Sequence, residues 1–199
     1  MSFINTEKRH IVATVIWYGP AGSGKTATLQ RVVAKTGSPD AQTVQVDVPP
    51  GASPATYEFL PFDLGKIRDY GVTLRLFTVP GAAQLAVERR SLLEHVDGVV
   101  FVADSRPDRQ QENRTSLGEL QDHLSAWGFA LERMPLVLQC TFGDVPGAMP
   151  SAQVAATLLA GLPNAASVPV VDSNPSQGTG VFEALKLISK QVLSELRKG

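Results

Sequence analysis

A glycine-rich loop near the N-terminus constrains the fold of this chain more than any other feature. Residues 19–26 read Gly-Pro-Ala-Gly-Ser-Gly-Lys-Thr and follow a nearly continuous apolar run, residues 10–18. They fit the pattern G-x-x-x-x-G-K-[ST], in which a loop between a strand and a helix surrounds a phosphate group. The run before the loop is typical of a buried strand, and residues 25–37 have the periodicity of a helix. The loop therefore predicts a P-loop fold with a phosphate site.

The residues of this loop suggest how it would hold a nucleotide. Gly19, Gly22 and Gly24 allow a tight turn whose N–H groups approach the phosphates. Lys25 adds a positive charge for the outer phosphates, and Thr26 offers a hydroxyl to Mg²⁺. The other residues that we assign to nucleotide binding here are Ala21, Ser23 and Ala27, the last in place of a threonine. The alternative is a glycine-rich turn that has lost its ligand.

Predicted strands and helices alternate along the chain. Strands are expected at 10–18, 42–48, 71–79, 97–105, 134–140 and 166–173, and helices at 25–37, 91–96, 110–127, 151–161 and 180–196. Such alternation is typical of an α/β protein, with a mostly parallel six-stranded sheet and helices on both faces. The 199 residues fit one domain, 1–199. Ligands of such sheets bind at the carboxyl ends of the strands, where the loop lies.

The composition excludes several classes of function. The net charge of −1 gives no field that would recruit nucleic acid, and no apolar run approaches the roughly 20 residues of a membrane span. The chain begins Met-Ser and has no cysteine near its end, so no lipid-anchor motif is expected. Its one cysteine, Cys140, is predicted to be a small buried hydrophobe. We expect a cytoplasmic protein without an integral membrane segment or a nucleic-acid partner.

Several further segments resemble one family of proteins. They are MSFIN at 1–5, YGPAGSGKTATLQ at 18–30, EFLPFDLGKIR at 58–68, LFTVPG at 76–81, VDGVVFVADS at 96–105 and GTGVFEALK at 178–186. Together they resemble the bacterial Ras-like small GTPases of the gliding-motility and cell-polarity type, the MglA family. The resemblance implies a cytoplasmic GTP/GDP switch that uses Mg²⁺. It also implies motility or polarity effectors and a roadblock-type activating protein as partners.

The residues that carry hydrolysis in this family are absent here. The glutamine that follows TVPG, and therefore Gly81, is replaced by Ala82, which has no hydrogen-bonding group to orient water. Gln84 could substitute only if the loop were rebuilt. The arginine and threonine of the first switch fall on Ser53 and Pro54, and Ser53 could serve only as a ligand of Mg²⁺. We therefore assign no catalytic residue from the pattern of this family.

The guanine-reading motif N-K-x-D is partly kept, as residues 141–144. Asp144 can accept two hydrogen bonds from guanine, while Thr141 and Phe142 replace the asparagine and the lysine. Phe142 could cover the base as the lysine stem does, or it could pack inward and break the base pocket. Pro175 stands where relatives tend to carry alanine, which weakens the base site further.

For the remaining charged residues near these motifs we favour interpretations that involve no contact with a nucleotide. Arg68 and Arg75 could replace the missing arginine, but surface charge is the simpler interpretation, as it is for Arg89 and Arg90. Asp104 could contact the Mg²⁺ shell through water, or it could cap the next turn, which we favour.

Three functions are compatible with these features. The first is a GTP-binding switch with slow hydrolysis, or with hydrolysis completed by a partner. The second is a pseudo-GTPase interaction module that holds nucleotide without turnover or binds none. The third is a P-loop ATPase or small-molecule kinase, against which we find no arginine-rich lid, and Asp144 favours guanine over adenine.

Overall fold

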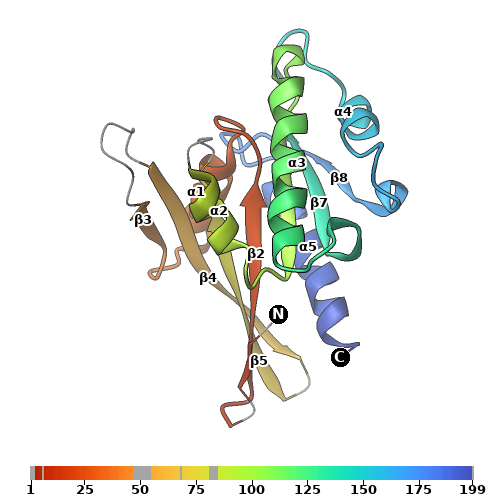
Figure 1. Cartoon of the computed structure of the whole chain (residues 1–199). Helices are drawn as coiled ribbons and strands as arrows, with labels where there is room; N and C mark the ends of the chain where they lie inside the picture. The colour runs from red at the N-terminus through yellow and green to blue at the C-terminus, as the bar shows by residue number, and fades with distance from the viewer. Residues whose placement is uncertain (1–2, 6, 47–54, 68, 81–84, 199) are drawn as a thin grey trace.

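The computed structural model describes residues 3–5, 7–46, 55–67, 69–80 and 85–198 (Figure 1). One sheet runs through the molecule, with strands in the order β3-β4-β5-β2-β6-β7-β8 and β1 paired to β2. The strands are β1 (Phe3–Asn5), β2 (His10–Tyr18), β3 (Gln42–Val46), β4 (Ala55–Ile67), β5 (Tyr70–Thr78), β6 (Gly98–Asp104), β7 (Leu136–Thr141) and β8 (Val170–Asp172).

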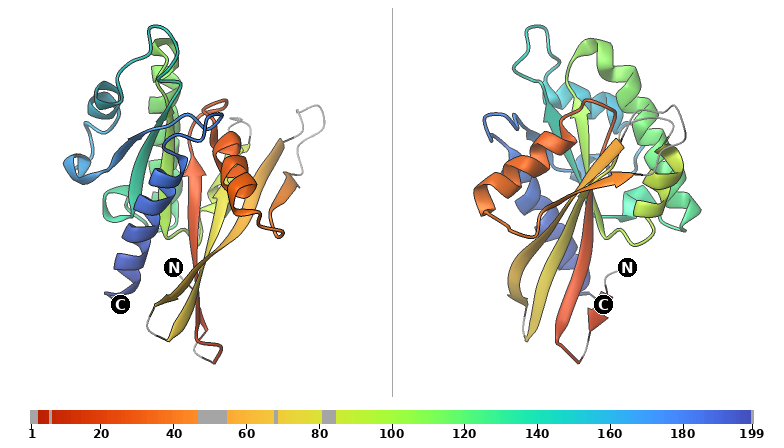
Figure 2. Two further views of the ribbon diagram at one scale, coloured as in Figure 1. Left: turned by 180° about the vertical axis from the view of Figure 1, so that it is seen from behind. Right: turned by 90° about the vertical axis from the view of Figure 1, so that its left-hand side faces the viewer.

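In the part of the chain that the structure describes, five α-helices cover this sheet on both faces. They are α1 (Lys25–Thr36), α2 (Ala86–Leu92), α3 (Gln110–Ala126), α4 (Ser151–Leu158) and α5 (Val181–Leu196). Figure 2 shows α1 and α5 on one face, whereas α2, α3 and α4 lie on the other. The predicted α/β class with helices on both faces is therefore confirmed.

Five neighbouring strands of the described sheet, β5, β2, β6, β7 and β8, run parallel to one another. β2 pairs in parallel with β5 and β6, β6 with β7, and β7 with β8. The pairs β1–β2, β3–β4 and β4–β5 are antiparallel. The parallel strands thus end at one edge, which gathers the loops after β2, β6 and β7.

Among the described residues the sheet contains eight strands, two more than the six predicted. The short β1 and the long β4 were not expected as strands. β4 contains Pro61, which has no N–H for a ladder, and a register shift between Asp63 and Lys66. The pairing of β3 reaches only as far as Phe59, so Pro61 lies where β4 has a neighbour on one side alone. An edge position tolerates proline, and this explains how a strand forms through it.

The sheet separates two hydrophobic clusters. Alternate β2 residues supply both, with Ile16 and Tyr18 facing α3 and α4, and Val15 and Trp17 facing α1 and α5. Trp17 and Tyr18 have no solvent-exposed surface, as predicted for core residues. Cys140 is buried as predicted, and burial raises the pKa of its thiol to about 12.

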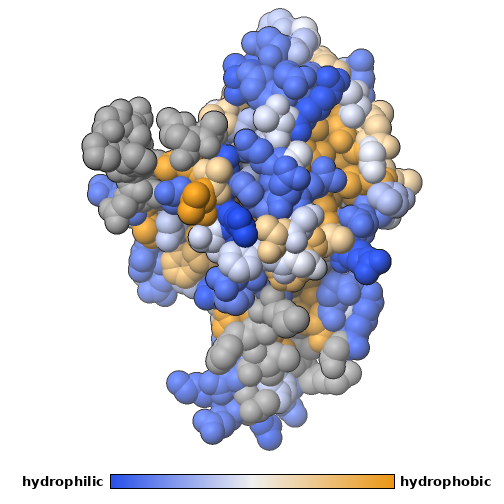
Figure 3. All heavy atoms as spheres, viewed as in Figure 1, coloured by the Kyte–Doolittle hydropathy of each residue, from blue (hydrophilic) through white to orange (hydrophobic). Residues whose placement is uncertain are grey.

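The outer surface of α3 is largely polar (Figure 3). Figure 3 shows hydrophilic residues over α3, with hydrophobic residues beside it on the side where α4 lies. This distribution is that of amphipathic helices packed on a sheet. Within the described part of the chain, no helix combines the length and the apolar character that crossing a membrane requires.

Candidate functional site

The loop between β2 and α1 depends on glycine at both of its ends. Gly19 has φ 147°, and a Cβ atom there would lie 2.3 Å from the carbonyl oxygen of Val102 in β6. Gly24 has φ 92° and directly precedes the first residue of α1. Both positions require glycine, because any other side chain would clash with its neighbours or strain the backbone. The sequence therefore fixes the loop at the carboxyl edge of the sheet, with the N-terminus of α1 at its end.

Lys25 is buried inside this loop. Its Nζ donates hydrogen bonds to the carbonyl oxygens of Gly19 (2.8 Å) and Pro20 (2.6 Å). Burial, and then the positive charge of Arg89, lower its pKa to about 7. A neutral amine has two N–H donors, and the two carbonyls use both of them. An added anion would favour the charged form, whose third N–H is then available to that anion.

A cavity of about 410 Å³ lies beside the loop. Its wall includes Ala21, Gly22, Gly24, Lys25, Thr26, Ala27, Gln30, Thr56, Val79 and Pro80. Six of the predicted nucleotide-binding residues, Thr26 among them, thus line one cavity, while Ser23 is fully buried. Ser53, Gly81, Ala82 and Gln84 lie outside the described residues.

Thr56 is a residue that sequence reasoning missed. It lies at the start of β4 and lines the same cavity as Thr26, so two hydroxyl-bearing residues line one space. A hydroxyl is a suitable ligand for Mg²⁺, which prefers oxygen. The signal was obscured because counting back from EFLP placed the first-switch positions at Ser53 and Pro54, three and two residues before Thr56. The antiparallel pairing of Thr56 with Gln45 would have been needed to find it.

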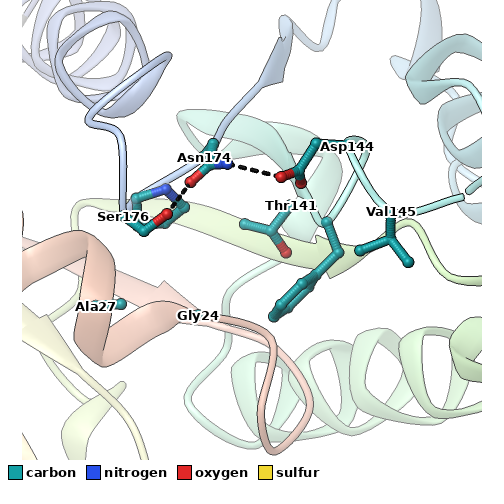
Figure 4. Close-up of a pocket in the computed structure, with 9 residues that line it drawn as sticks. Gly24, Ala27, Thr141, Asp144, Val145, Asn174 and Ser176 are labelled. Atoms are coloured by element: carbon teal, nitrogen blue, oxygen red, sulfur yellow. Dashed lines mark hydrogen bonds between the residues drawn. The ribbon is translucent and has the colours of Figure 1, made fainter.

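A second cavity, of about 200 Å³, adjoins the first (Figure 4). Gly24 and Ala27 line both cavities, and Thr141, Phe142, Asp144, Val145, Asn174, Pro175 and Ser176 complete the second. The three loops after β2, β7 and β8 therefore converge here. The chain brings the predicted residues 141, 142 and 144 next to the P-loop, as the motif requires.

Asp144 is positioned by the loop after β8. Asn174 donates from Nδ2 to Oδ2 of Asp144 at 2.9 Å, and Figure 4 shows this bond on the cavity wall. The hydroxyl of Ser176 donates to Oδ1 of Asn174 at 2.6 Å, which orients the amide. One carboxylate oxygen is thus engaged and the other is left for a ligand. Sequence reasoning missed Asn174 because its role appears only when the two loops are brought together.

Thr141 connects the two cavities through its side chain. It is buried, and its Oγ1 lies 2.8 Å from the carbonyl oxygen of Ser23 and 3.1 Å from that of Ala103. The hydroxyl donates to either acceptor and so fastens β7 to the P-loop. Its contribution to a nucleotide site is therefore to hold the loop in place.

Phe142 lines the second cavity and belongs to neither hydrophobic cluster. Its φ is 57°, the left-handed region that non-glycine residues rarely adopt. The guanidinium carbon of Arg106 lies 4.5 Å from the centre of its ring. This placement agrees with the first of the two alternatives, in which the ring covers the base.

The predicted exposure of Arg89 is wrong. Arg89 is 2% exposed and forms an ion pair of 2.8 Å with Glu119 of α3. Its Nη1 also lies 3.4 Å from the carbonyl oxygen of Pro80, two residues after the end of β5. Three charged residues, Glu88, Arg89 and Arg90, are adjacent in the short helix α2, so its sequence does not indicate which side packs inward. Arg89 therefore anchors α2 to α3, close enough to Lys25 to lower its pKa.

Arg75 and Asp104 have structural partners. Arg75 is half-buried and donates to the hydroxyl of Thr14 at 3.1 Å. Asp104 accepts a hydrogen bond from the backbone N–H of Arg106 at 3.0 Å, which confirms the predicted cap of the turn. Arg68 lies outside the described residues.

The comparisons with known proteins agree with this geometry. The family model of the ADP-ribosylation factors (Arf) matches residues 3–192. The mutual gliding-motility protein MglA of Myxococcus xanthus (strain DK1622) is 36% identical over 200 residues, which cover 100% of both chains. The chain belongs to the Arf-related small GTPases of the MglA type. The resemblance read from the motifs is thereby confirmed.

Small GTPases of this family bind guanine nucleotides with Mg²⁺, and the site of this MglA-type chain can be tested against that ligand. The phosphate side fits, because glycines hold the loop open and a buried lysine lacks an anionic partner among the described residues. The base side fits in part, since Asp144 is oriented toward the cavity while Pro175 provides no N–H.

Proposed function

We propose that this chain is a GTP-binding switch, formed by one Ras-like domain over residues 1–199, with slow or partner-dependent hydrolysis. The observation that carries the proposal is the adjoining pair of cavities. One contains Lys25 within the P-loop, and the other contains Asp144 held by Asn174. Lys25 would bind the phosphates of a guanine nucleotide, and Asp144 in the adjoining cavity would accept hydrogen bonds from its base. A hydrogen bond to a charged group contributes roughly 1.5–3 kcal/mol, which favours guanine over adenine.

The nucleotide would be held together with Mg²⁺. Thr26 and Thr56 would supply hydroxyl ligands, and the ion would neutralise charge on the phosphates. Ser53 remains a weaker candidate for the same role. Gly81 is proposed as a backbone contact to the last phosphate.

Slow hydrolysis follows from the residues at the switch positions. A positioned arginine contributes about 10³ to 10⁵ in rate in related switches, and Ser53 cannot supply a guanidinium. Ala82 cannot orient a water molecule, and only a rebuilt loop would let Gln84 do so. A partner that provides these groups in trans would restore turnover.

The partners proposed here come from the relative and the family. The relative is named for gliding motility, and we infer that this chain also acts on motility or polarity effectors, with a roadblock-type activating protein. The net charge of −1 gives no support for nucleic acid as a partner. The single cysteine is consistent with action in the cytoplasm.

A second candidate function is that of a pseudo-GTPase, because Ala82 and Ser53 stand where the family carries its hydrolytic glutamine and arginine. A pseudo-GTPase would keep the cradle and hold nucleotide without turnover, or present the fold alone as a binding surface. Both functions predict the same fold, so only ligand content and turnover separate them.

The experiment begins with the protein as purified. It is denatured, and any released nucleotide is identified by chromatography. The emptied protein is then titrated with GTP, GDP and ATP in Mg²⁺, and GTP turnover is followed in a single round. Bound guanine nucleotide with slow turnover supports the switch. Tight GTP binding without turnover supports the pseudo-GTPase, and equal affinity for ATP contradicts both.

A further inference from the structure

Asp104 is a fully buried carboxylate at the end of β6. Arg106 meets it with a two-pronged contact, Nη2 to Oδ2 at 2.6 Å and Nε to Oδ1 at 3.0 Å. Nε of Arg109 lies 3.7 Å from Oδ2 of the same carboxylate. One buried negative charge is thus shared by two arginines.

The first of these arginines reaches the base side. Arg106 lies over the ring of Phe142 at 4.5 Å, in the geometry of a cation–π contact. Phe142 lines the cavity beside Asp144, and its left-handed backbone requires support from its surroundings. Arg106 therefore holds the ring from the side of Asp104.

The second arginine reaches the phosphate side. Nη2 of Arg109 donates to the carbonyl oxygen of Ala21 in the P-loop at 2.7 Å, and Nη1 bonds Glu112 at 2.9 Å. Ala21 lines the cavity that contains Lys25. Arg109 thus fixes the outer turn of the loop to the start of α3.

The segment that carries both arginines is itself held firmly. Asn113 accepts from the N–H of Asp104 at 3.0 Å and donates to its carbonyl at 2.8 Å. Gln110 donates to the carbonyls of Asp104 (2.9 Å) and Arg106 (2.8 Å). These bonds hold the backbone of the segment that carries both arginines.

We propose that Arg106 and Arg109, joined by Asp104, are positioning residues that take over the work of the lysine lost at position 142. Arg106 holds Phe142 as a platform for the base, and Arg109 holds the P-loop for the phosphates. This inference rests on the proposed nucleotide-binding function. It adds that the two halves of the site are connected through a single buried carboxylate.

The test measures GDP release and phosphate binding separately. Dissociation of a fluorescent N-methylanthraniloyl GDP is timed in wild type, Arg106→Gln, Arg109→Gln and Arg114→Gln. Arg114 is a matched control, because it is an exposed arginine on α3. Inorganic tripolyphosphate, which has no base, is titrated against each variant. Thermal unfolding verifies that all variants are folded.

We expect Arg106→Gln to speed GDP release about tenfold and to leave tripolyphosphate affinity unchanged. Arg109→Gln should weaken both ligands, and Arg114→Gln neither. In a Phe142→Ala background, the effect of Arg106→Gln on GDP release should disappear, because the platform it supports is gone. A general loss of stability would not depend on Phe142 in this way.

The opposite results separate this inference from the proposed function. Wild-type protein that binds neither GDP nor tripolyphosphate overturns the function and the inference together. Wild-type protein that binds GDP, with unchanged release in Arg106→Gln, overturns the inference alone. So does an equal effect of Arg106→Gln with and without Phe142.

Discussion

The phosphate side and the base side of this site are preserved to different degrees. The phosphate side keeps every residue of its motif, and its glycines adopt conformations and close approaches that other residues cannot. The base side keeps Asp144 alone from its motif, and Asn174 and Arg106 support it from other loops. Backbone geometry has few substitutes, whereas a side-chain contact can be supplied from several places in a fold. The base side is therefore where such a chain can diverge.

The largest expected effect is on the phosphate side. Lys25→Ala should lower GTP and GDP affinity by about 10³-fold or more, because it removes a buried cation from the phosphate cavity. The measurement is a titration of emptied protein in Mg²⁺. Lys35→Ala, on the same helix, is the control and should change affinity little. Unchanged binding in Lys25→Ala would mean that the loop is a relic or that the ligand binds elsewhere.

A smaller loss is expected on the base side. Asp144→Asn should reduce GTP affinity by roughly ten- to a hundredfold, because an amide NH₂ cannot accept from guanine donors. Its remaining oxygen can still accept from Asn174, so the loop should keep its shape. ATP affinity should stay constant, and competition titrations with both nucleotides measure the difference. Equal losses for GTP and ATP would show that Asp144 does not contact the base.

The pH dependence of binding gives an independent measure of Lys25. In the free protein burial lowers its pKa to about 7, and a bound polyphosphate raises it, so binding above that pH takes up a proton. GDP affinity should therefore fall as the pH rises above about 7, by up to about tenfold per unit. Titrations at a series of pH values test this, with Lys25→Arg as the control that stays charged. A flat wild-type profile would contradict the prediction.

The lowered pKa of Lys25 should make the stability of the nucleotide-free protein rise with pH, whereas GDP affinity falls. Between about 7 and the ordinary value of 10.5, Lys25 is neutral when folded and charged when unfolded. The unfolded state then binds more protons, so the stability of the free protein rises with pH across this window. Denaturant midpoints of nucleotide-free protein should show this rise, and Lys25→Arg should not.

Much of the fold could be predicted from sequence because it depends on local patterns. Buried parallel strands such as β6 and β7 are continuous apolar runs, and Gly37 ends α1 in the left-handed conformation expected of a C-terminal glycine. β4 could not be predicted because Pro61 interrupts its pattern, and only its neighbours show that the position is an edge.

The site divides in the same way. The P-loop is contiguous, so its residues and roles follow from one stretch of sequence. Thr56, Asn174 and Arg109 come from separate elements, and each was found only because the sheet brings its loop to the same edge. Arg89 shows the converse, since an arginine that looked exposed is buried against α3 by tertiary packing.

A gain is expected from repairing the base side. Pro175 lines the base cavity and has no N–H to offer an acceptor on the base. Pro175→Ala should restore a donor and raise GTP affinity about two- to fivefold, the value of one neutral hydrogen bond. ATP affinity should not rise with it. A parallel gain for both nucleotides would indicate a change in loop flexibility rather than a new contact.

The smallest expected effect concerns turnover. Ala82→Gln alone should change single-turnover GTP hydrolysis by less than about threefold, because the charge that an arginine provides is still missing at Ser53. Ser53→Arg together with Ala82→Gln should give a much larger increase, since the two groups act on one transition state. The rate is followed by phosphate release from preloaded protein. A large gain from Ala82→Gln alone would mean that an arginine already reaches the phosphates, and Arg109, which touches the P-loop, would be the first to replace.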